Sequence, residues 1–136
     1  MNYIKVLLSV TCLTCLFGCK AVDTPRSFTI GKGGGFTGKY DTYLVKSDGL
    51  VYKTNEGQAD ELIKKIDKKQ IALIFKHFDQ LNIIEDKFSH PGNMTSFIRY
   101  TVDSKSYEIK WGSTNAVPPQ KYADFFDEVW KLIREK

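Results

Sequence analysis

The residues with the clearest chemical pattern form a glycine-rich and lysine-rich run, GKGGGFTGK, at positions 31–39. The GxGxxG spacing that starts at Gly33 matches a dinucleotide-binding turn, and the segment that ends at Lys39 matches most of a phosphate-binding P-loop. Both motifs need a buried parallel strand before the glycines and a helix after them, whose N-terminus faces the phosphate. Residues 40–47 have the composition of a strand instead, and Tyr40 stands where a P-loop carries the Ser or Thr that holds magnesium. We therefore do not expect a nucleotide site.

The remaining reactive side chains show no catalytic or metal-ligand spacing. His77 falls off the apolar stripe of a predicted helix, which favours a surface position, and His90 precedes Pro91 in a predicted loop. The aspartates have turn or helix-cap explanations, and adjacent acidic pairs look like solvated faces. We predict that the chain is not an enzyme and that it holds no cofactor and no metal.

The first nineteen residues have the pattern of a bacterial export signal that ends in a lipid-modified cysteine. Residues 6–17 are an apolar run that is too short to span a membrane but has the length of a signal-peptide core. The run leads into Leu16-Phe17-Gly18-Cys19, which resembles a lipobox, although Phe17 departs from its usual small or β-branched residue. We predict a lipoprotein signal peptide over residues 1–18 and acylation of Cys19.

Two other interpretations of this segment stay open: a plain secretory signal cut nearby, and an uncleaved anchor. If Cys19 is the acylated residue, Cys12 and Cys15 leave with the signal, and the mature domain has no free thiol, disulfide or cysteine-bound metal. Several acyl chains would then anchor the protein to the membrane without a spanning helix.

Residues 19–27 follow as the lipidated cysteine and a short polar tether that contains Pro25. Lys20 stands where an aspartate would retain a bacterial lipoprotein in the inner membrane, so the outer membrane is favoured. Loss of Lys5 with the signal lowers the net charge from +4 to +3. The charges are interleaved rather than clustered, which argues against nucleic-acid binding.

Residues 28–136 are predicted to form a single α+β domain. Residues 28–31, 40–47 and 50–54 have strand composition, and Asp48-Gly49 between the last two predicts a tight hairpin with positive φ at both turn residues. Residues 96–102 and 106–111 alternate as a second hairpin around residues 103–105. Residues 60–66 fit a strand or an extra helical turn, and we favour the strand.

Two amphipathic helices complete the pattern. Asp67 is a predicted N-cap, with Gln70 three residues later, for a helix that runs to about Leu81. Pro118-Pro119 opens the last helix. Both helices carry apolar residues at three- and four-residue spacing. The expected architecture is hairpin-helix-hairpin-helix, a two-layer α+β fold in which an antiparallel sheet of about four to five strands packs on the two helices.

The glycine run has two interpretations within this fold. It could be a bulge or wide turn with Phe36 folded onto the sheet. It could instead be a recognition loop, in which the glycines allow close backbone approach and an exposed Phe36 anchors a partner. The aromatic residues Tyr100, Tyr107 and Trp111 are expected in the core rather than on a binding surface.

Gly34-Gly35-Phe36-Thr37-Gly38 resembles the opening motif of the emfourin family, small inhibitors of thermolysin-like metalloproteases. The order of strands after it, and the paired prolines before a closing helix, are also similar to that family and to small envelope-lipoprotein domains of unknown function. The resemblance implies a partner-binding loop that occupies a protease cleft without being cleaved, with Thr37 close to the catalytic metal.

Three functional hypotheses follow in order of preference. The first is a lipid-anchored, non-catalytic envelope domain that binds another protein through Gly34, Gly35, Phe36, Thr37 and Gly38, with a metalloprotease as the candidate partner. The second is a structural or accessory lipoprotein whose loop has no specific partner. The third is an enzyme or a carrier of a small ligand, which a deep polar pocket lined by His90 or Glu108 would support.

Overall fold

A computed structural model describes residues 24–135 of the chain. Nine elements of regular structure and a 3-10 turn follow one another in this range. They are β1 (Ser27–Gly34), η1 (Gly35–Thr37), β2 (Lys39–Lys46), β3 (Leu50–Thr54), β4 (Glu61–Lys65), α1 (Lys68–Leu81), β5 (Ser89–His90), β6 (Met94–Val102), β7 (Lys105–Trp111) and α2 (Gln120–Arg134).

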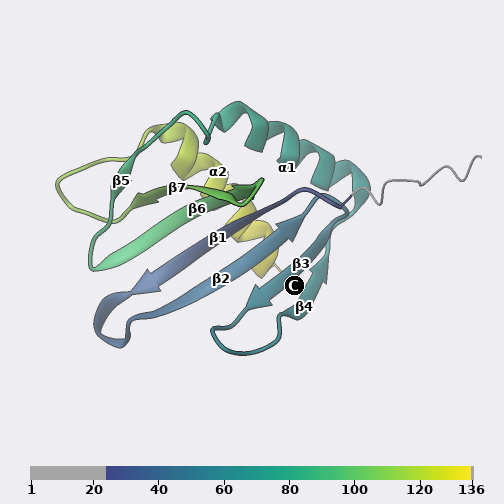
Figure 1. Ribbon diagram of the computed structural model, residues 1–136, viewed down its shortest axis with the longest axis horizontal. Helices are drawn as coiled ribbons and strands as arrows, with labels where there is room; N and C mark the ends of the chain where they lie inside the picture. The colour runs from purple at the N-terminus through teal and green to yellow at the C-terminus, as the bar shows by residue number, and fades with distance from the viewer. Residues whose placement is uncertain (1–23, 136) are drawn as a thin grey trace, which may run out of the picture.

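The strands form one sheet in the order β4-β3-β2-β1-β6-β7-β5, with β1 at its centre (Figure 1). The α+β class and the two helices agree with the sequence, but the predicted sheet of four to five antiparallel strands is wrong, because there are seven strands. The seventh, β5, pairs in parallel with β7, so the sheet is mixed. It has only two residues, which is too short for any alternating pattern to reveal. The segment at residues 60–66 is a strand, as favoured, and a bulge interrupts its pairing with β3 between Val51 and Tyr52.

The two hairpin turns differ from the prediction in their geometry. Gly49 has a φ of 92°, whereas Asp48 keeps an ordinary backbone and uses its side chain to accept a hydrogen bond from the Leu50 N–H. The expectation of positive φ at both residues is therefore wrong at this turn. It holds instead at Asp103 and Ser104, with φ of 49° and 62°, between the paired residues Val102 and Lys105. That pair of left-handed residues matches the twist of the two strands that it joins.

Helix α1 begins and ends as its sequence predicts. The Asp67 carboxylate accepts hydrogen bonds from the N–H groups of Lys69 and Gln70, each at 3.0 Å, and Asn82 closes the helix in a left-handed conformation. The predicted apolar stripe is buried. Its residues are Ile71, Ile74, Phe75, Phe78 and Leu81.

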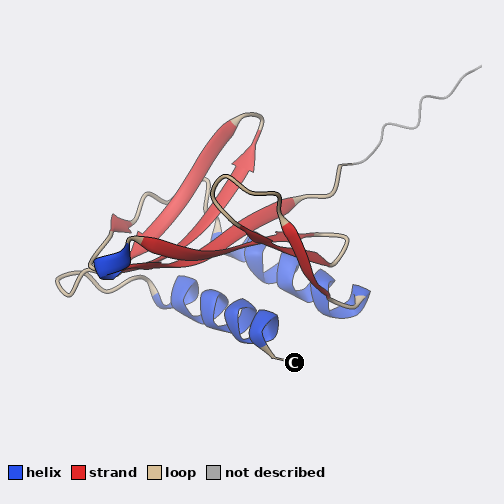
Figure 2. Cartoon of the chain, turned by 90° about the horizontal axis from the view of Figure 1, so that it is seen from below, coloured by secondary structure: helices blue, strands red, loops and turns tan. Residues whose placement is uncertain are grey.

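Both helices lie on the same side of the sheet, and the opposite side of the sheet is uncovered (Figure 2). Aromatic rings join the elements of the covered side. The Phe28 ring of β1 stacks on Phe78 of α1, with 4.7 Å between ring centroids, and meets Phe125 of α2 edge-on at 5.4 Å. Tyr100 and Trp111 pack against this cluster from β6 and β7, as expected for core aromatics, whereas Tyr107 is half-buried and is not part of the cluster.

The start of α2 is tied to the end of α1 through Tyr122. Its ring is buried, and its hydroxyl donates to Oδ2 of Asp86 at 2.7 Å and lies 3.2 Å from the carbonyl oxygen of Leu81. The Lys121 ammonium donates to the same carbonyl at 2.8 Å. These groups satisfy a carbonyl at the C-terminus of α1 that has no partner within its own helix. The Tyr122 hydrogen bond also lowers the pKa of Asp86 below its ordinary value, because it stabilises the ionised carboxylate.

At the other end of α2 a lysine from the sheet has the same role. Lys64 of β4 donates from its ammonium group to the carbonyl oxygens of Leu132, at 2.6 Å, and Glu135, at 2.8 Å. A cation at a helix C-terminus is favourable because the exposed carbonyls carry partial negative charge. Each end of α2 is therefore attached to a different part of the domain.

Tyr122→Phe should lower the free energy of unfolding at neutral pH by about 1–2 kcal/mol, because it removes a buried hydrogen bond to an ionised carboxylate. The difference from the wild type should shrink as the pH falls below the ordinary aspartate value of 3.8, since Asp86 becomes protonated and the wild type loses the same stabilisation. Urea unfolding at a series of pH values measures both effects. Tyr52→Phe is the matched control, and an unchanged difference at acid pH would contradict the assignment to Asp86.

Candidate functional site

The glycine run divides between a strand and a turn. The central strand β1 includes Gly31, Gly33 and Gly34 and continues to Gly34. The predicted end of this strand at Gly31 and the predicted loop over residues 31–39 are therefore wrong. The turn itself is the short η1 followed by Gly38. The predicted contact residues all lie together here. Gly34 ends β1, Gly35, Phe36 and Thr37 form η1, and Gly38 leads into β2.

Hydrogen bonds and backbone conformation hold this turn. The Gly35 N–H donates to the carbonyl oxygen of Asn93 at 2.6 Å, and the Gly38 N–H donates to that of Gly35 at 3.3 Å. Gly34, Gly35 and Gly38 have φ of 107°, 65° and 63°, which side chains with a Cβ rarely adopt. The turn therefore requires its glycines for reasons internal to the fold. Phe36, between them, is fully exposed, so the interpretation in which it folds onto the sheet is wrong.

The glycines of β1 leave space for aromatic rings on the uncovered face of the sheet. A Cβ placed on Gly31 would lie 2.4 Å from Cε1 and Cζ of Phe97, so the ring of this β6 residue rests against the bare strand. Tyr40 reaches the same area from β2, with 6.0 Å between its ring centroid and that of Phe97. At Gly33 a Cβ would lie 2.2 Å from the carbonyl oxygen of Lys39, so this position also excludes a side chain.

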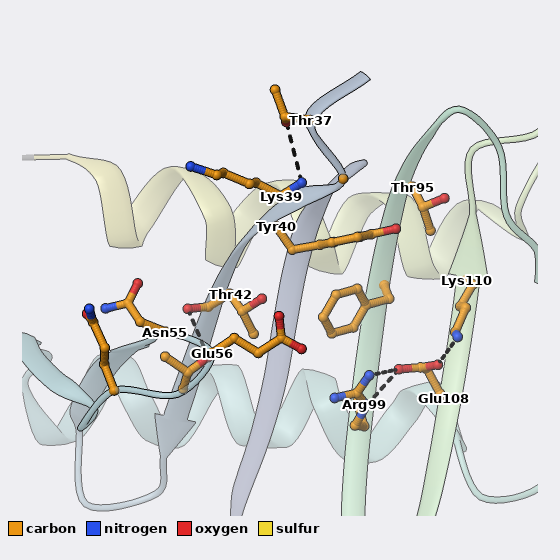
Figure 3. A pocket seen from close by; sticks show the side chains of 14 residues that line it. Thr37, Lys39, Tyr40, Thr42, Asn55, Glu56, Thr95, Arg99, Glu108 and Lys110 are labelled. Atoms are coloured by element: carbon orange, nitrogen blue, oxygen red, sulfur yellow. Dashed lines mark hydrogen bonds and ion pairs between the residues drawn. The ribbon is translucent and has the colours of Figure 1, made fainter. Parts of the chain in front are cut away.

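A broad groove of about 980 Å³ lies over this part of the face and is open to solvent. One wall comes from β2 and the segment after β3, and the other comes from β6 and β7, with Tyr40 between them (Figure 3). The groove is lined by Thr37, Gly38, Lys39, Tyr40, Thr42, Thr54, Asn55, Glu56, Gln58, Thr95, Phe97, Arg99, Glu108 and Lys110.

The charged residues of one wall form an ion-paired network in which one carboxylate is shared by two cations. Glu108 accepts from Nε of Arg99 at 2.6 Å, and Nζ of Lys110 lies 2.6 Å from its other carboxylate oxygen. The side chain of Glu108 is only 17 % exposed. The Arg99 guanidinium also lies over the Phe97 ring, 4.9 Å from its centroid. This network fixes the orientation of three side chains along the groove (Figure 3).

The sequence named Glu108 as a possible lining residue of a deep polar pocket, and Glu108 does line this broad, open groove, whereas His90 does not. The groove itself was not predicted, although part of its signal is present in the sequence. Alternation in the second hairpin places Phe97 and Arg99 on one face of the first strand. In the second strand it places Glu108 and Lys110 on the face opposite to that strand's apolar residues. The turn at residues 103–104 sets the register that pairs Arg99 with Glu108 and Phe97 with Lys110. The contribution of the β3–β4 segment depends on how the strands are arranged in space, and no local pattern reveals it.

The other candidate residues of the sequence lie apart from the groove. His77 is half-exposed on α1, with Nδ1 3.0 Å from a carboxylate oxygen of Glu128 on α2. His90 forms part of β5, where its ring lies beside that of Phe88. Within residues 24–135 no group of three or more histidine, cysteine or acidic side chains is placed to hold a metal ion. In the same range, neither helix is long and apolar enough to cross a membrane.

Comparison with known proteins does not assign a family. No family model matches the chain, and no significant match to a curated protein is found. The predicted signal peptide over residues 1–18, the acylated Cys19 and residues 20–23 of the predicted tether lie outside the described residues. The last residue of that tether, Ser27, is the first residue of β1, so the predicted start of the domain at residue 28 is corrected.

Gly31→Ala should destabilise the fold by about 1–3 kcal/mol, because the new methyl group would overlap the Phe97 ring. The penalty should be smaller in a Phe97→Leu background, where the atoms that it meets are absent. Chemical denaturation of the four proteins of this double-mutant cycle measures the coupling. Additive effects would show that the contact between Gly31 and Phe97 does not constrain the strand.

Proposed function

We propose that this protein is a lipid-anchored domain of the bacterial cell envelope that binds another protein, without catalysis, through the turn at Gly34, Gly35, Phe36, Thr37 and Gly38. The observation that carries the proposal is the full exposure of Phe36 on a turn held by backbone hydrogen bonds. A large aromatic side chain on a preorganised support loses little conformational freedom on binding, which makes it an efficient anchor for a partner.

The position of the turn in the molecule supports this role. The described chain enters β1 at one end of the domain, and the β1–β2 turn lies at the opposite end (Figure 1). The eight residues of β1 span about 26 Å between these ends. Arg26 at the entry pairs with Asp79 of α1, so the point at which the tether would leave is held against the domain. A domain anchored through residues 19–27 would therefore present Phe36 away from its attachment point.

The surroundings of the turn enlarge the apolar contact. A Cβ at Gly35 would lie 3.2 Å from the sulfur of Met94, and Met94 is 49 % exposed. Methionine adapts its shape to a partner surface because its side chain is flexible and polarisable. Phe36 and Met94 together provide a small apolar tip at the end of the sheet.

A metalloprotease is the candidate partner, on the resemblance of Gly34-Gly35-Phe36-Thr37-Gly38 to the emfourin motif. The tip is a connection of four residues between the paired Gly34 and Lys39 at the end of the β1–β2 hairpin, which suits insertion into a cleft. We further infer that the sheet and the two helices act as a two-layer unit that holds the tip rigidly. The ring contacts of Phe28 with both helices support that inference.

A structural or accessory lipoprotein is the alternative function. It is favoured by the finding that each glycine of the turn has a conformational reason to be glycine, so that no partner is needed to explain them. It leaves the exposed Phe36 without a role, which is why partner binding is preferred.

Phe36→Ala should abolish capture of the partner from detergent-solubilised envelope while changing the free energy of unfolding by less than about 0.5 kcal/mol, because the ring makes few contacts within the fold. The full-length protein serves as bait, and inhibition of a thermolysin-like protease is assayed on the same material. Val117→Ala, at another exposed apolar residue, is the matched control. Captured proteins that bind both variants equally would favour the accessory function.

Cys19→Ala should prevent acylation and move the protein out of the membrane fraction, because the anchor is proposed to be the lipid alone. Mass spectrometry of the N-terminal peptide and membrane fractionation give the two readouts. Cys15→Ala should leave both unchanged. Unacylated protein that stays in the membrane fraction would contradict the lipid anchor.

A further inference from the structure

We infer that the groove on the uncovered face of the sheet binds an uncharged oligosaccharide segment, with Tyr40 as the ring on which a sugar stacks. The groove adjoins the Phe36 tip and shares Thr37 and Gly38 with that turn, but Phe36 itself does not line it, and the inference does not depend on the proposed protein partner. The groove of about 980 Å³ lies at the upper end of the roughly 300–1,000 Å³ range of small-ligand sites, so several linked sugar rings would fit along it.

The charge pattern of the groove favours a neutral ligand. Arg99 and Lys110 share the single carboxylate of Glu108, so the three groups keep one net positive charge, but neither cation is left without an ion-pair partner. Lys39 and Glu56 provide one further charge of each sign on the lining. An anionic ligand would have to compete with Glu108 for its cations. A ligand rich in hydroxyl groups can instead donate to the carboxylate and accept from the cations without breaking the pairs.

Uncharged polar groups line the rest of the groove. On the wall opposite Arg99 they include Thr42, Asn55 and Gln58, whose side chains both donate and accept hydrogen bonds. Hydroxyl groups of a sugar have the same dual character. One wall of the groove therefore offers groups that both donate and accept hydrogen bonds, and the other offers a fixed ionic network. Together they complement the polar edges of a sugar ring on both sides.

Tyr40 supplies the apolar contact that the flat face of a sugar ring requires. Tyr40 projects between the two walls of the groove and is 45 % exposed (Figure 3). Its ring is supported by the Phe97 ring, which packs against Gly31. Carbon-bound hydrogens on the face of a pyranose pack well against an aromatic ring, whose face carries negative charge. The glycines of β1 thus position an aromatic platform at the bottom of a polar groove.

An extended peptide is a poorer occupant of this groove. Peptides that bind a sheet usually add as a strand and pair with an open backbone edge. The strands beneath the groove have no such edge, because β2 pairs with β1 and β3, β1 pairs with β2 and β6, and β6 pairs with β1 and β7. Recognition here must come from side chains, which matches a sugar better than a backbone.

The test is a titration of the ¹⁵N-labelled full-length chain, in a detergent without a sugar headgroup, with maltotetraose, cellotetraose and chitotetraose. At least one of them should shift the amide signals of groove residues. Calorimetry should then show binding weakened about tenfold by Tyr40→Ala and little changed by Tyr40→Phe, which keeps the ring. Tyr52→Ala, on the same face but outside the groove, and Phe36→Ala should bind as the wild type does. Thermal unfolding of each variant confirms that it is folded.

Two results would overturn the inference. The first is the absence of any shift in the groove signals at millimolar concentrations of all three tetrasaccharides. The second is a shift caused only by a blocked, uncharged hexapeptide of alternating valine and threonine, which would make the groove a peptide site. Binding that is equally strong in folded Tyr40→Ala would also exclude the stacking role of Tyr40.

Discussion

The uncovered face depends on one contact, in which the Phe97 ring packs against the backbone of Gly31. Glycines at two alternate positions of the central strand, Gly31 and Gly33, reduce the free energy of unfolding, because glycine loses more backbone freedom on folding than other residues. The cost is offset when neighbouring strands supply the missing bulk. Here the rings of Phe97 from β6 and Tyr40 from β2 fill this space, and the Arg99 guanidinium lies over the Phe97 ring. The shape of the groove, the direction of Tyr40 and the fixed position of Arg99 all follow from this arrangement.

The covered face follows the more common logic of an apolar core, but its helices are positioned by polar contacts at their ends. Tyr122 and Lys121 satisfy a carbonyl at the end of α1, and Lys64 satisfies two at the end of α2. Apolar burial is not directional, so it cannot by itself fix where a helix lies along a sheet. The hydrogen bonds at the helix ends supply that specificity. The result is a support on which the turn at Gly35 and Phe36 is held at a defined position.

The sequence predicts those parts of the structure whose cause is local. The cap at Asp67 and the apolar stripe of α1 are confirmed, because helix periodicity and capping are properties of neighbouring residues. The role of Gly31 was missed, since a glycine-rich run has the composition of a loop and only its contact with Phe97 explains why it is a strand. The two residues of β5 carry no pattern at all, and the groove requires the arrangement of four separate segments. The sequence allows Phe36 either to fold onto the sheet or to be exposed, and only the geometry of the surrounding turn decides between the two.

The bulge in the pairing of β3 and β4 has a consequence for how neighbouring copies of the protein meet. Strand β4 is an outer strand of the sheet, and Leu62 and Ile63 on it are 54 % and 38 % exposed. An open strand with exposed apolar residues invites the same strand of a neighbouring molecule to pair with it. The bulge makes the open backbone irregular, and Lys64 and Lys65 place charges beside the apolar pair. Lys64 is in addition committed to the end of α2, so it cannot easily move aside. Lys64 thus has two roles, because it satisfies the carbonyls at the end of α2 and also opposes edge-to-edge pairing of neighbouring copies.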